Sequence, residues 1–319
     1  MTDARSFTVQ PEEAGERLDR FLVRRCPELG RRGAASLIER GLVQVGGRRA
    51  SKGARLLAGD VVRAPLDFGF APASEAAPLD VRLERADLVV VEKPAGQPTA
   101  PLAPGETGTL GGALLARYPE MRGIGYRERE PGIIHRLDTR TSGLVIAART
   151  QLAFEVLRDA LRAHRLDKRY LAIVEAAGLP DEVRIDLPLA LERGGSGRVL
   201  AVTPGADVKG AVECLSVVRV LERRGRFALV DVAASRAFRH QVRVHLSAAG
   251  WPIAGDREYG GARREALAAR HALHASHVAW AGDERVPAFA VDSPLPPDLA
   301  AFFAAGSGLG GESINDASS

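Results

Sequence analysis

The spacing of hydrophobic positions predicts helices in the first third of the chain. Residues 16–25, ERLDRFLVRR, place leucine and phenylalanine on one side of a helix and arginines on the other. The stretch at 34–40 repeats this pattern, and Gly41 is placed to end that helix. The Gly-Gly pair at 46–47 supplies the positive φ of a tight hairpin, and LLAGDVVRA follows as a short strand. These elements predict a compact module over residues 1–65.

Beyond residue 79 the pattern changes to strands with intervening helices. ADLVVVEKPAG, KRYLAIVEA, FALVDVAAS and HVAW have the apolar character of strands. GLVIAA has no polar alternation, which is typical of a strand buried on both faces. Thr150 is placed to cap a following helix. Polar and apolar residues alternate in RHQVRVHL, which predicts a strand with Arg239, Gln241, Arg243 and His245 on one face.

Length and composition favour two domains of unequal size. With 319 residues, we expect a first domain at 1–65, a linker at 66–78, a larger domain at 79–305 and a disordered tail at 306–319. The longest apolar runs are about five to seven residues, far below the roughly 20 that span a bilayer, and no secretory signal is visible. Two distant cysteines fit a reducing cytoplasm and argue against a zinc site. We therefore expect a cytoplasmic protein with no membrane association.

The basic residues are concentrated near the N-terminus. Residues 1–65 carry 13 Lys and Arg against 8 Asp and Glu, a net charge of +5 in a chain whose total is +4. A GC-rich genome accounts for the excess of arginine over lysine, but not for its place in the chain. The uneven charge indicates a polyanionic partner for the first module.

Two polar clusters are candidates for chemistry. The first is HRLDTRTSG, residues 135–143, where Asp138 stands among cations directly before the buried strand; the second is RHQVRVHL, residues 239–246. A carboxylate beside arginine stays ionised even when partly buried, as a carboxylate nucleophile requires. Solvated strand edges are the alternative for either cluster alone. A Gly-rich stretch lacks the ending of a phosphate loop, and histidines at 271, 274 and 277 are better interpreted as packed or hydrogen-bonded than as metal ligands.

The two clusters, with several other motifs, closely resemble the RluA-type family of pseudouridine synthases. HRLDTRTSGLVIAART is similar to the family signature, and VVEKPAGQPTAP, KRYLAIV, RHQVRVHLSAAGWPIAGDREYGG and RHALHASHVAW resemble its other motifs in order. Residues 1–65 resemble the ribosomal-protein-S-four-type RNA-binding domain. Departures occur at Ala237-Phe238-Arg239, at Ala100-Pro101, and in the first module, which lacks the usual Ser-Arg start and Asn-Gly turn.

The resemblance implies an α+β catalytic fold, a mixed and mainly antiparallel sheet with flanking helices and a central cleft, preceded by a small α+β RNA-binding domain. It implies an isomerase that detaches uracil from its ribose in RNA, turns it and rejoins it through carbon, without cofactor or metal. Asp138 would be the nucleophile, Arg243 its ion-pair partner and Tyr170 the residue that stacks on the base and assists removal of the ring proton. Arg136 would fill the gap left by the extruded uridine. The other substrate contacts implied are His135, Arg239, His240 and Gln241.

Large-subunit ribosomal RNA is the first expected target and transfer RNA the second, and we expect a monomer. Two other functions remain open at this point. A glycosidase-like hydrolase could use the same acid, although hydrolysis usually needs two carboxylates and one stands out here. An RNA-binding protein without catalysis is the third possibility, against which the presence of Asp138, Tyr170 and Arg243 argues.

Overall fold

The chain forms two compact units, Met1–Pro78 with Pro98–Gly132 and Leu79–Gln97 with Ile133–Ser319. The predicted tail lies outside the described residues, as does most of the predicted linker, and the predicted domain boundaries remain predictions. The computed structural model describes residues 4–26, 30–39, 41–51, 53–65, 73, 77–101, 106–126, 129–192, 197–203, 205–206, 208–234, 236, 238–260 and 270–305.

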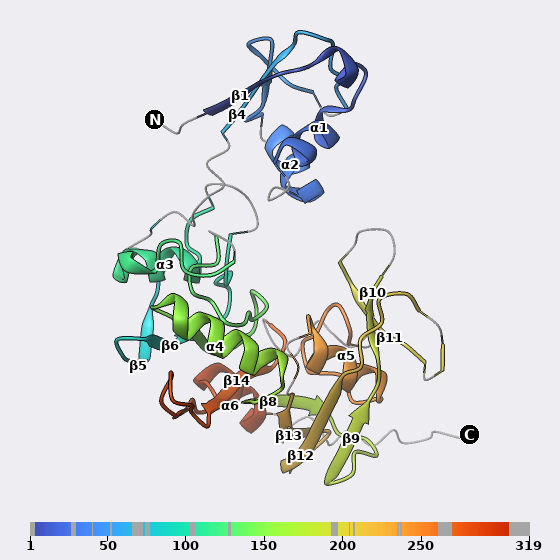
Figure 1. Cartoon of the computed structure of the whole chain (residues 1–319). Coiled ribbons are helices and arrows are strands. Elements are labelled where there is room, and N and C mark those ends of the chain that lie inside the picture. The colour runs from blue at the N-terminus through green and yellow to red at the C-terminus, as the bar shows by residue number, and fades with distance from the viewer. Residues whose placement is uncertain are drawn as a thin grey trace, which may run out of the picture. The chain divides into compact units, whose positions relative to one another are not determined.

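In the first unit, two helices share one core with a four-stranded antiparallel sheet of order β1-β4-β2-β3 (Figure 1). The predicted apolar side of the first helix is correct, since Leu18, Phe21 and Leu22 are fully buried. The helices and strands of this unit are β1 (Ala4–Thr8), η1 (Pro11–Glu13), α1 (Leu18–Arg25), α2 (Gly30–Glu39), β2 (Gln44–Val45), β3 (Arg48–Arg49), β4 (Val61–Pro65), α3 (Leu110–Arg117) and η3 (Pro119–Met121).

Glycines with positive φ lie at the turns of this unit. Gly46 and Gly47 have φ of 57° and 80° and join β2 to β3, which confirms the predicted hairpin. Gly41, with φ of 67°, follows the end of α2. Two predicted boundaries were wrong: α2 begins four residues earlier than the spacing indicated, and only the second half of LLAGDVVRA is a strand.

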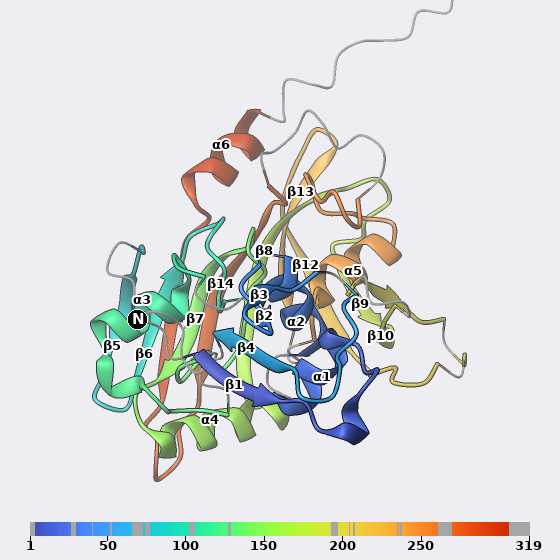
Figure 2. The same ribbon diagram turned by 90° about the horizontal axis from the view of Figure 1, so that it is seen from above.

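A nine-stranded sheet forms the second unit, in the order β5-β6-β7-β14-β8-β13-β12-β9, with β15 paired to β14 (Figure 2). Its pairs are antiparallel except β7 with β14, so the predicted mixed, mainly antiparallel sheet is confirmed. Its strands are β5 (Asp80–Glu84), β6 (Leu88–Lys93), β7 (Ser142–Ala148), β8 (Leu166–Glu175), β9 (Glu182–Asp186), β12 (Leu215–Arg224), β13 (Phe227–Ala233), β14 (Leu273–Trp280) and β15 (Phe289–Asp292); β10 (Leu189–Leu191) and β11 (Val199–Ala201) form a separate hairpin.

Three helices accompany this sheet. The helix α4 (Gln151–Arg162) lies along β7 and β8, and the hydroxyl of Thr150 accepts a hydrogen bond from the Ala153 amide, as predicted for its N-cap (Figure 1). The helix α5 (Gln241–Ala248) lies beside β11 and β12, and α6 (Pro297–Ala305) places Leu299 and Phe303 in the core of the sheet.

The sequence prediction failed at α5, which was expected to be a strand. Residues 241–246 are all buried, polar and apolar alike, because the polar side chains have partners on other elements. A helix that is buried on every side has no apolar stripe, and its alternating residues imitate a strand. Arg243 and Gln241 therefore do not share one face of a sheet.

A single row of residues crosses the middle strands. Lys93 on β6 lies opposite Gly143 on β7, Gly143 opposite Ala275 on β14, and Ala275 opposite Tyr170 on β8. Residues directly opposite each other point to the same side of a sheet. Glycine and alanine occupy the two middle positions, so the row itself adds no large side chain between Lys93 and Tyr170.

Gly143→Ala should destabilise this sheet strongly. Gly143 has φ of +117°, and a Cβ atom there would lie 2.2 Å from the carbonyl oxygen of Ala275. We expect a loss of more than about 3 kcal/mol in the free energy of unfolding, from strain and the backbone clash together. Urea denaturation measures it. The matched control is Gly250→Ala, which has φ of +91° but open space around it, so only the strain of about 1–2 kcal/mol applies. Equal losses in the two variants would contradict the clash.

Candidate active site

Asp138 lies in the short loop that enters β7. The loop is fixed by backbone hydrogen bonds, from the Ile134 amide to the Ile146 carbonyl and from the Thr141 amide to the Asp138 carbonyl, both of 3.0 Å. Leu137 is buried, whereas the Asp138 side chain keeps 25% of its surface exposed. The backbone thus holds this carboxylate at the edge of the core, still open to a substrate.

The guanidinium of Arg243 binds Asp138. Its Nη1 donates to Asp138 Oδ2 at 2.8 Å, so the ion pair expected between these residues is present. Its Nε and Nη2 donate to both oxygens of Asp256 at 2.7 and 2.8 Å, and Nη2 also donates to Glu258 Oε2 at 3.2 Å. Burial opposes the charged form of Arg243, yet the hydrogen bonds and charges of these carboxylates raise its pKa above the ordinary value. Arg243 is permanently charged and has little freedom to move.

His240 is the second group beside the nucleophile. It precedes α5 with φ of 57°, and its Nε2 lies 3.5 Å from Asp138 Oδ1. Because Nε2 accepts a hydrogen bond from Arg239 at 3.2 Å, the proton is on Nδ1, which donates to the Tyr259 hydroxyl at 2.8 Å. Burial lowers the pKa of His240, while the charge of Asp138 opposes that shift. The ring is therefore neutral at neutral pH.

Tyr170 and Lys93 flank Asp138 from the sheet. Burial, followed by the charge of Asp138, raises the pKa of Tyr170 to about 12, so its hydroxyl stays protonated at neutral pH. Lys93 is fully buried, and its Nζ donates to the carbonyls of Pro94, Gln97 and Thr139 at 2.9, 2.9 and 3.3 Å. Burial lowers the pKa of Lys93 to about 7. Its bonds tie the turn after β6 to the loop that carries Asp138.

The histidines at 271, 274 and 277 are hydrogen-bonded, as expected. His271 Nε2 lies 2.7 Å from the Thr141 hydroxyl, His274 bridges the hydroxyls of Ser142 and Ser293 at 2.9 and 3.0 Å, and His277 bonds to a carboxylate. Burial lowers the pKa of both His271 and His274 to about 4. These contacts join the start of β14 to the start of β7. Among the described residues, no group of three or more His, Cys, Asp and Glu side chains has an arrangement that could hold a metal ion.

The remaining residues expected to contact substrate fall into two groups. Arg136 and Arg239 are exposed, close in sequence to Asp138 and His240 respectively. His135 and Gln241 are buried: His135 Nε2 accepts from the Ile146 amide, and Gln241 donates to the Leu215 carbonyl at 2.8 Å. This geometry favours a structural role for the buried pair, and substrate contact by all four stays a prediction.

Sequence reasoning missed the groups that surround Arg243 from the chain after α5. Asp256, Glu258 and Tyr259 stand in GDREYGG, which we compared with the family only as a motif. Lys93 was likewise overlooked within VVEKPAG. The signal that the sequence offered was an aspartate, Asp256, only 13 residues after Arg243. The sequence does not show, however, that the chain turns back to meet that arginine.

Comparison with known proteins decides the family. The family described as "RNA pseudouridylate synthase" matches residues 87–248, and the S4 domain matches residues 16–62. The chain belongs to the RNA pseudouridine synthases. It is 38% identical to an uncharacterized RNA pseudouridine synthase of Chloroflexus aurantiacus, over 93% of this chain and 92% of that protein. It is 31% identical to "Ribosomal large subunit pseudouridine synthase D" of Neisseria meningitidis serogroup A, over 92% of this chain and 79% of that one. The enzyme is thus an isomerase that acts on RNA.

Solved structures agree on the fold. The chain is similar to human RNA pseudouridylate synthase domain containing 1, with a TM-score of 0.57 and 24% identity over 73% of this chain and 91% of that one. It is also similar to human RNA pseudouridylate synthase domain containing 4, with a TM-score of 0.56 and 21% identity over 70% of this chain and 92% of that one. The described part of this pseudouridine synthase has no helix both long and apolar enough to cross a membrane.

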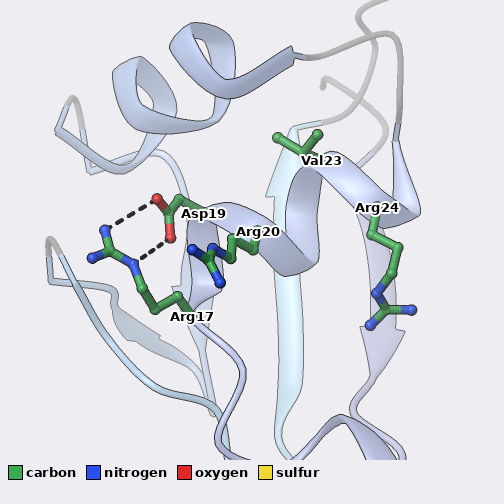
Figure 3. Close-up of a pocket in the computed structure, with 5 residues that line it drawn as sticks. All are labelled: Arg17, Asp19, Arg20, Val23 and Arg24. Atoms are coloured by element: carbon green, nitrogen blue, oxygen red, sulfur yellow. Dashed lines mark hydrogen bonds and ion pairs between the residues drawn. The ribbon is translucent and has the colours of Figure 1, made fainter. Parts of the chain in front are cut away.

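The S4 domain provides RNA binding to the synthase. A hollow of about 620 Å³ lies along α1 and is lined by Arg17, Asp19, Arg20, Val23 and Arg24 (Figure 3). Two of these arginines are engaged by carboxylates: Arg17 pairs with Asp19 at 2.9 Å, and Arg24 pairs with two glutamates at 2.8 and 2.6 Å. Arg20 is exposed and forms no ion pair with a described residue. Among the arginines of this hollow, Arg20 is thus the one whose charge has no carboxylate partner among the described residues.

Lys93→Met should change the pH dependence of stability. The pKa of Lys93 is about 7 in the folded chain, against an ordinary value of 10.5. Between these values the unfolded chain binds more protons, so this group makes stability rise with pH by up to about 1.4 kcal/mol per unit. Urea denaturation from pH 7 to 10 should show this rise in the wild type relative to Lys93→Met. Lys168, a second buried lysine, is retained in both proteins, so the difference isolates Lys93. A difference that does not vary with pH would be inconsistent with a lowered pKa.

Arg20→Ala should weaken RNA binding by the S4 domain and reduce its salt dependence. Each lost phosphate contact removes about 0.7–0.9 from the slope of log affinity against log salt. Filter binding to ribosomal RNA between about 50 and 300 mM potassium chloride measures the slope. Arg24→Ala is the matched control, since its charge is already held by two glutamates, and its slope should change less. The opposite ranking would show that the free arginine is not the contact.

Proposed function

We propose that this pseudouridine synthase uses Asp138 as its nucleophile and modifies uridine in structured RNA, with large-subunit ribosomal RNA as the first target and transfer RNA as the second. The observation that carries the mechanism is the pairing of Asp138 with Arg243. The carboxylate is partly exposed, while its cation is buried and fixed. A carboxylate held in this way is ionised and aimed, which are the two properties that nucleophilic attack requires.

The remaining groups fit one sequence of events. Asp138 attacks C1′ of the ribose and forms a bond to it as the bond from C1′ to N1 of the uracil breaks, and the freed uracil turns. C5 of the uracil then bonds to C1′ as the bond to Asp138 breaks, N1 takes up a proton, and C5 gives its proton to solvent by way of a neighbouring group. Tyr170, on β8 and within the influence of the Asp138 charge, stacks on the base in this proposal. Since its hydroxyl stays protonated, it can assist that last step only by passing on its own proton as it receives another.

The target uridine must leave its base stack to reach Asp138. Extrusion costs a few kcal/mol and is least costly in loops and bulges, where recognition of single-stranded RNA also occurs. The exposed Arg136, two residues before the nucleophile, is in a position to fill the vacated space. The choice of ribosomal RNA is supported by the S4 domain and by the name of the Neisseria relative.

Asp138→Asn tests both the nucleophile and the target. Asparagine keeps the shape of the side chain but not its charge, and Arg243 keeps Asp256, so we expect a folded protein that binds RNA. Pseudouridines are mapped in ribosomal and transfer RNA from a strain that lacks this gene, with and without complementation. The wild type should restore at least one site in large-subunit ribosomal RNA, and Asp138→Asn should restore none.

The matched control is Asp181→Asn, which breaks an exposed arginine pair of 2.7 Å in the same unit. It should restore modification fully. Mass spectrometry must show that the asparagine of the Asp138→Asn variant has not deamidated to aspartate. Product from the intact variant would refute the nucleophile, and sites restored in transfer RNA alone would replace the proposed target by the second one.

A further inference from the structure

Asp256 is almost completely buried, with 1% of its side chain accessible. It accepts four hydrogen bonds: two from Arg243, and two to Oδ1 from the amides of Glu258 and Tyr259 at 3.0 and 3.2 Å. Burial would raise the pKa of Asp256, but these donors and the charge of Arg243 lower it overall. It is therefore ionised, and both of its oxygens are engaged by donors.

The segment that carries Asp256 is fixed to the sheet. The Ala254 amide donates to the Ile173 carbonyl at 2.9 Å, and Ile253 forms a bridge with Val174 on β8. The Gly260 amide donates to the Asp256 carbonyl at 2.8 Å and closes the turn. The strand that bears Tyr170 thus also sets the place of Asp256.

The guanidinium of Arg243 is contacted both along one edge, by hydrogen bonds in its plane, and on one face, by an aromatic ring. Asp256 binds its Nε and Nη2 edge, and the ring of Tyr259 lies 4.9 Å from its central carbon. Nη1, donating to Asp138, is left at the other edge. Because the guanidinium is planar and rigid, binding one edge to Asp256 fixes the direction in which Nη1 at the other edge donates.

We propose that Asp256 is the positioning residue of this active site: it fixes Arg243 so that one nitrogen meets Asp138, and its charge offsets that of the guanidinium. This inference rests on the proposed role of Asp138. The offset is useful because a carboxylate paired with an uncompensated cation is a poorer nucleophile. Among the described residues, the charged and titratable groups that face Asp138 are Arg243 on α5, His240 before it, Lys93 on β6, Tyr170 on β8, and His271 before β14.

Asp256→Asn tests the proposal. Asparagine retains one acceptor for Arg243 but no charge. We expect kcat to fall about 10- to 100-fold with KM for RNA within about twofold of wild type, because the reacting groups are misaligned while the binding surface is unchanged. The fall in kcat at unchanged KM is the result that a merely structural role would not give, because a partly unfolded protein would also bind RNA less well. The assay is tritium release from carbon-5-labelled RNA of the deletion strain at neutral pH.

Asp181→Asn serves as the control for an exposed aspartate–arginine pair, with kcat and KM as in wild type. Wild-type kcat in Asp256→Asn, or a rise in KM as large as the fall in kcat, would overturn the proposal. If Asp256→Asn does not fold, the Arg243→Lys variant is measured instead. A lysine ammonium cannot bind both oxygens of Asp256 and also reach Asp138. A wild-type kcat in Arg243→Lys would therefore overturn the proposal. Asp138→Asn is assayed in parallel. Activity in that variant refutes the nucleophile, whereas inactivity there with normal Asp256→Asn refutes only this inference.

Discussion

The active site depends on one buried guanidinium. Arg243 has 7% of its side chain exposed and binds Asp138, Asp256 and Glu258. A cation so buried is stable only if its donors are satisfied, and removal of one partner from such a pair is costly. The same requirement that stabilises the arginine fixes the carboxylate at the surface. The ion pairs that stabilise the buried Arg243 therefore also orient the Asp138 carboxylate.

The middle of the sheet carries small residues beside the site. The row from Lys93 through Gly143 and Ala275 to Tyr170 crosses four strands, and its two middle residues have either no side chain or a methyl group only. Gly143 is required there because the Ala275 carbonyl lies where a side chain would begin. Close approach of β7 and β14 is thus part of the site as well as part of the fold.

Buried titratable groups around the site are kept neutral or fully paired. His271 and His274 have pKa values lowered to about 4 by burial and hydrogen-bond to hydroxyls at the start of β7 and beyond it. Lys93 directs its amine to backbone carbonyls. Arg243 is the permanently charged group that is hydrogen-bonded to Asp138. The exposed arginines of the S4 domain, which include Arg20, add positive charge for RNA binding.

The sequence by itself determined the helices of the first module, the buried strand of GLVIAA, the cap at Thr150, the family and the choice of Asp138 as candidate nucleophile. These follow from local patterns, because period, turn residues and ordered motifs are properties of neighbouring residues. Only the tertiary structure decided that residues 241–248 are a helix and that Asp256 is the partner of Arg243. A helix covered on all sides has no amphipathic period. The contact of Arg243 with Asp138 joins residues 105 positions apart, and that of Asp256 depends on a turn anchored to β8. Packing between distant segments decides which polar groups meet in the core, and the hydrophobic periodicity of one segment does not predict that packing.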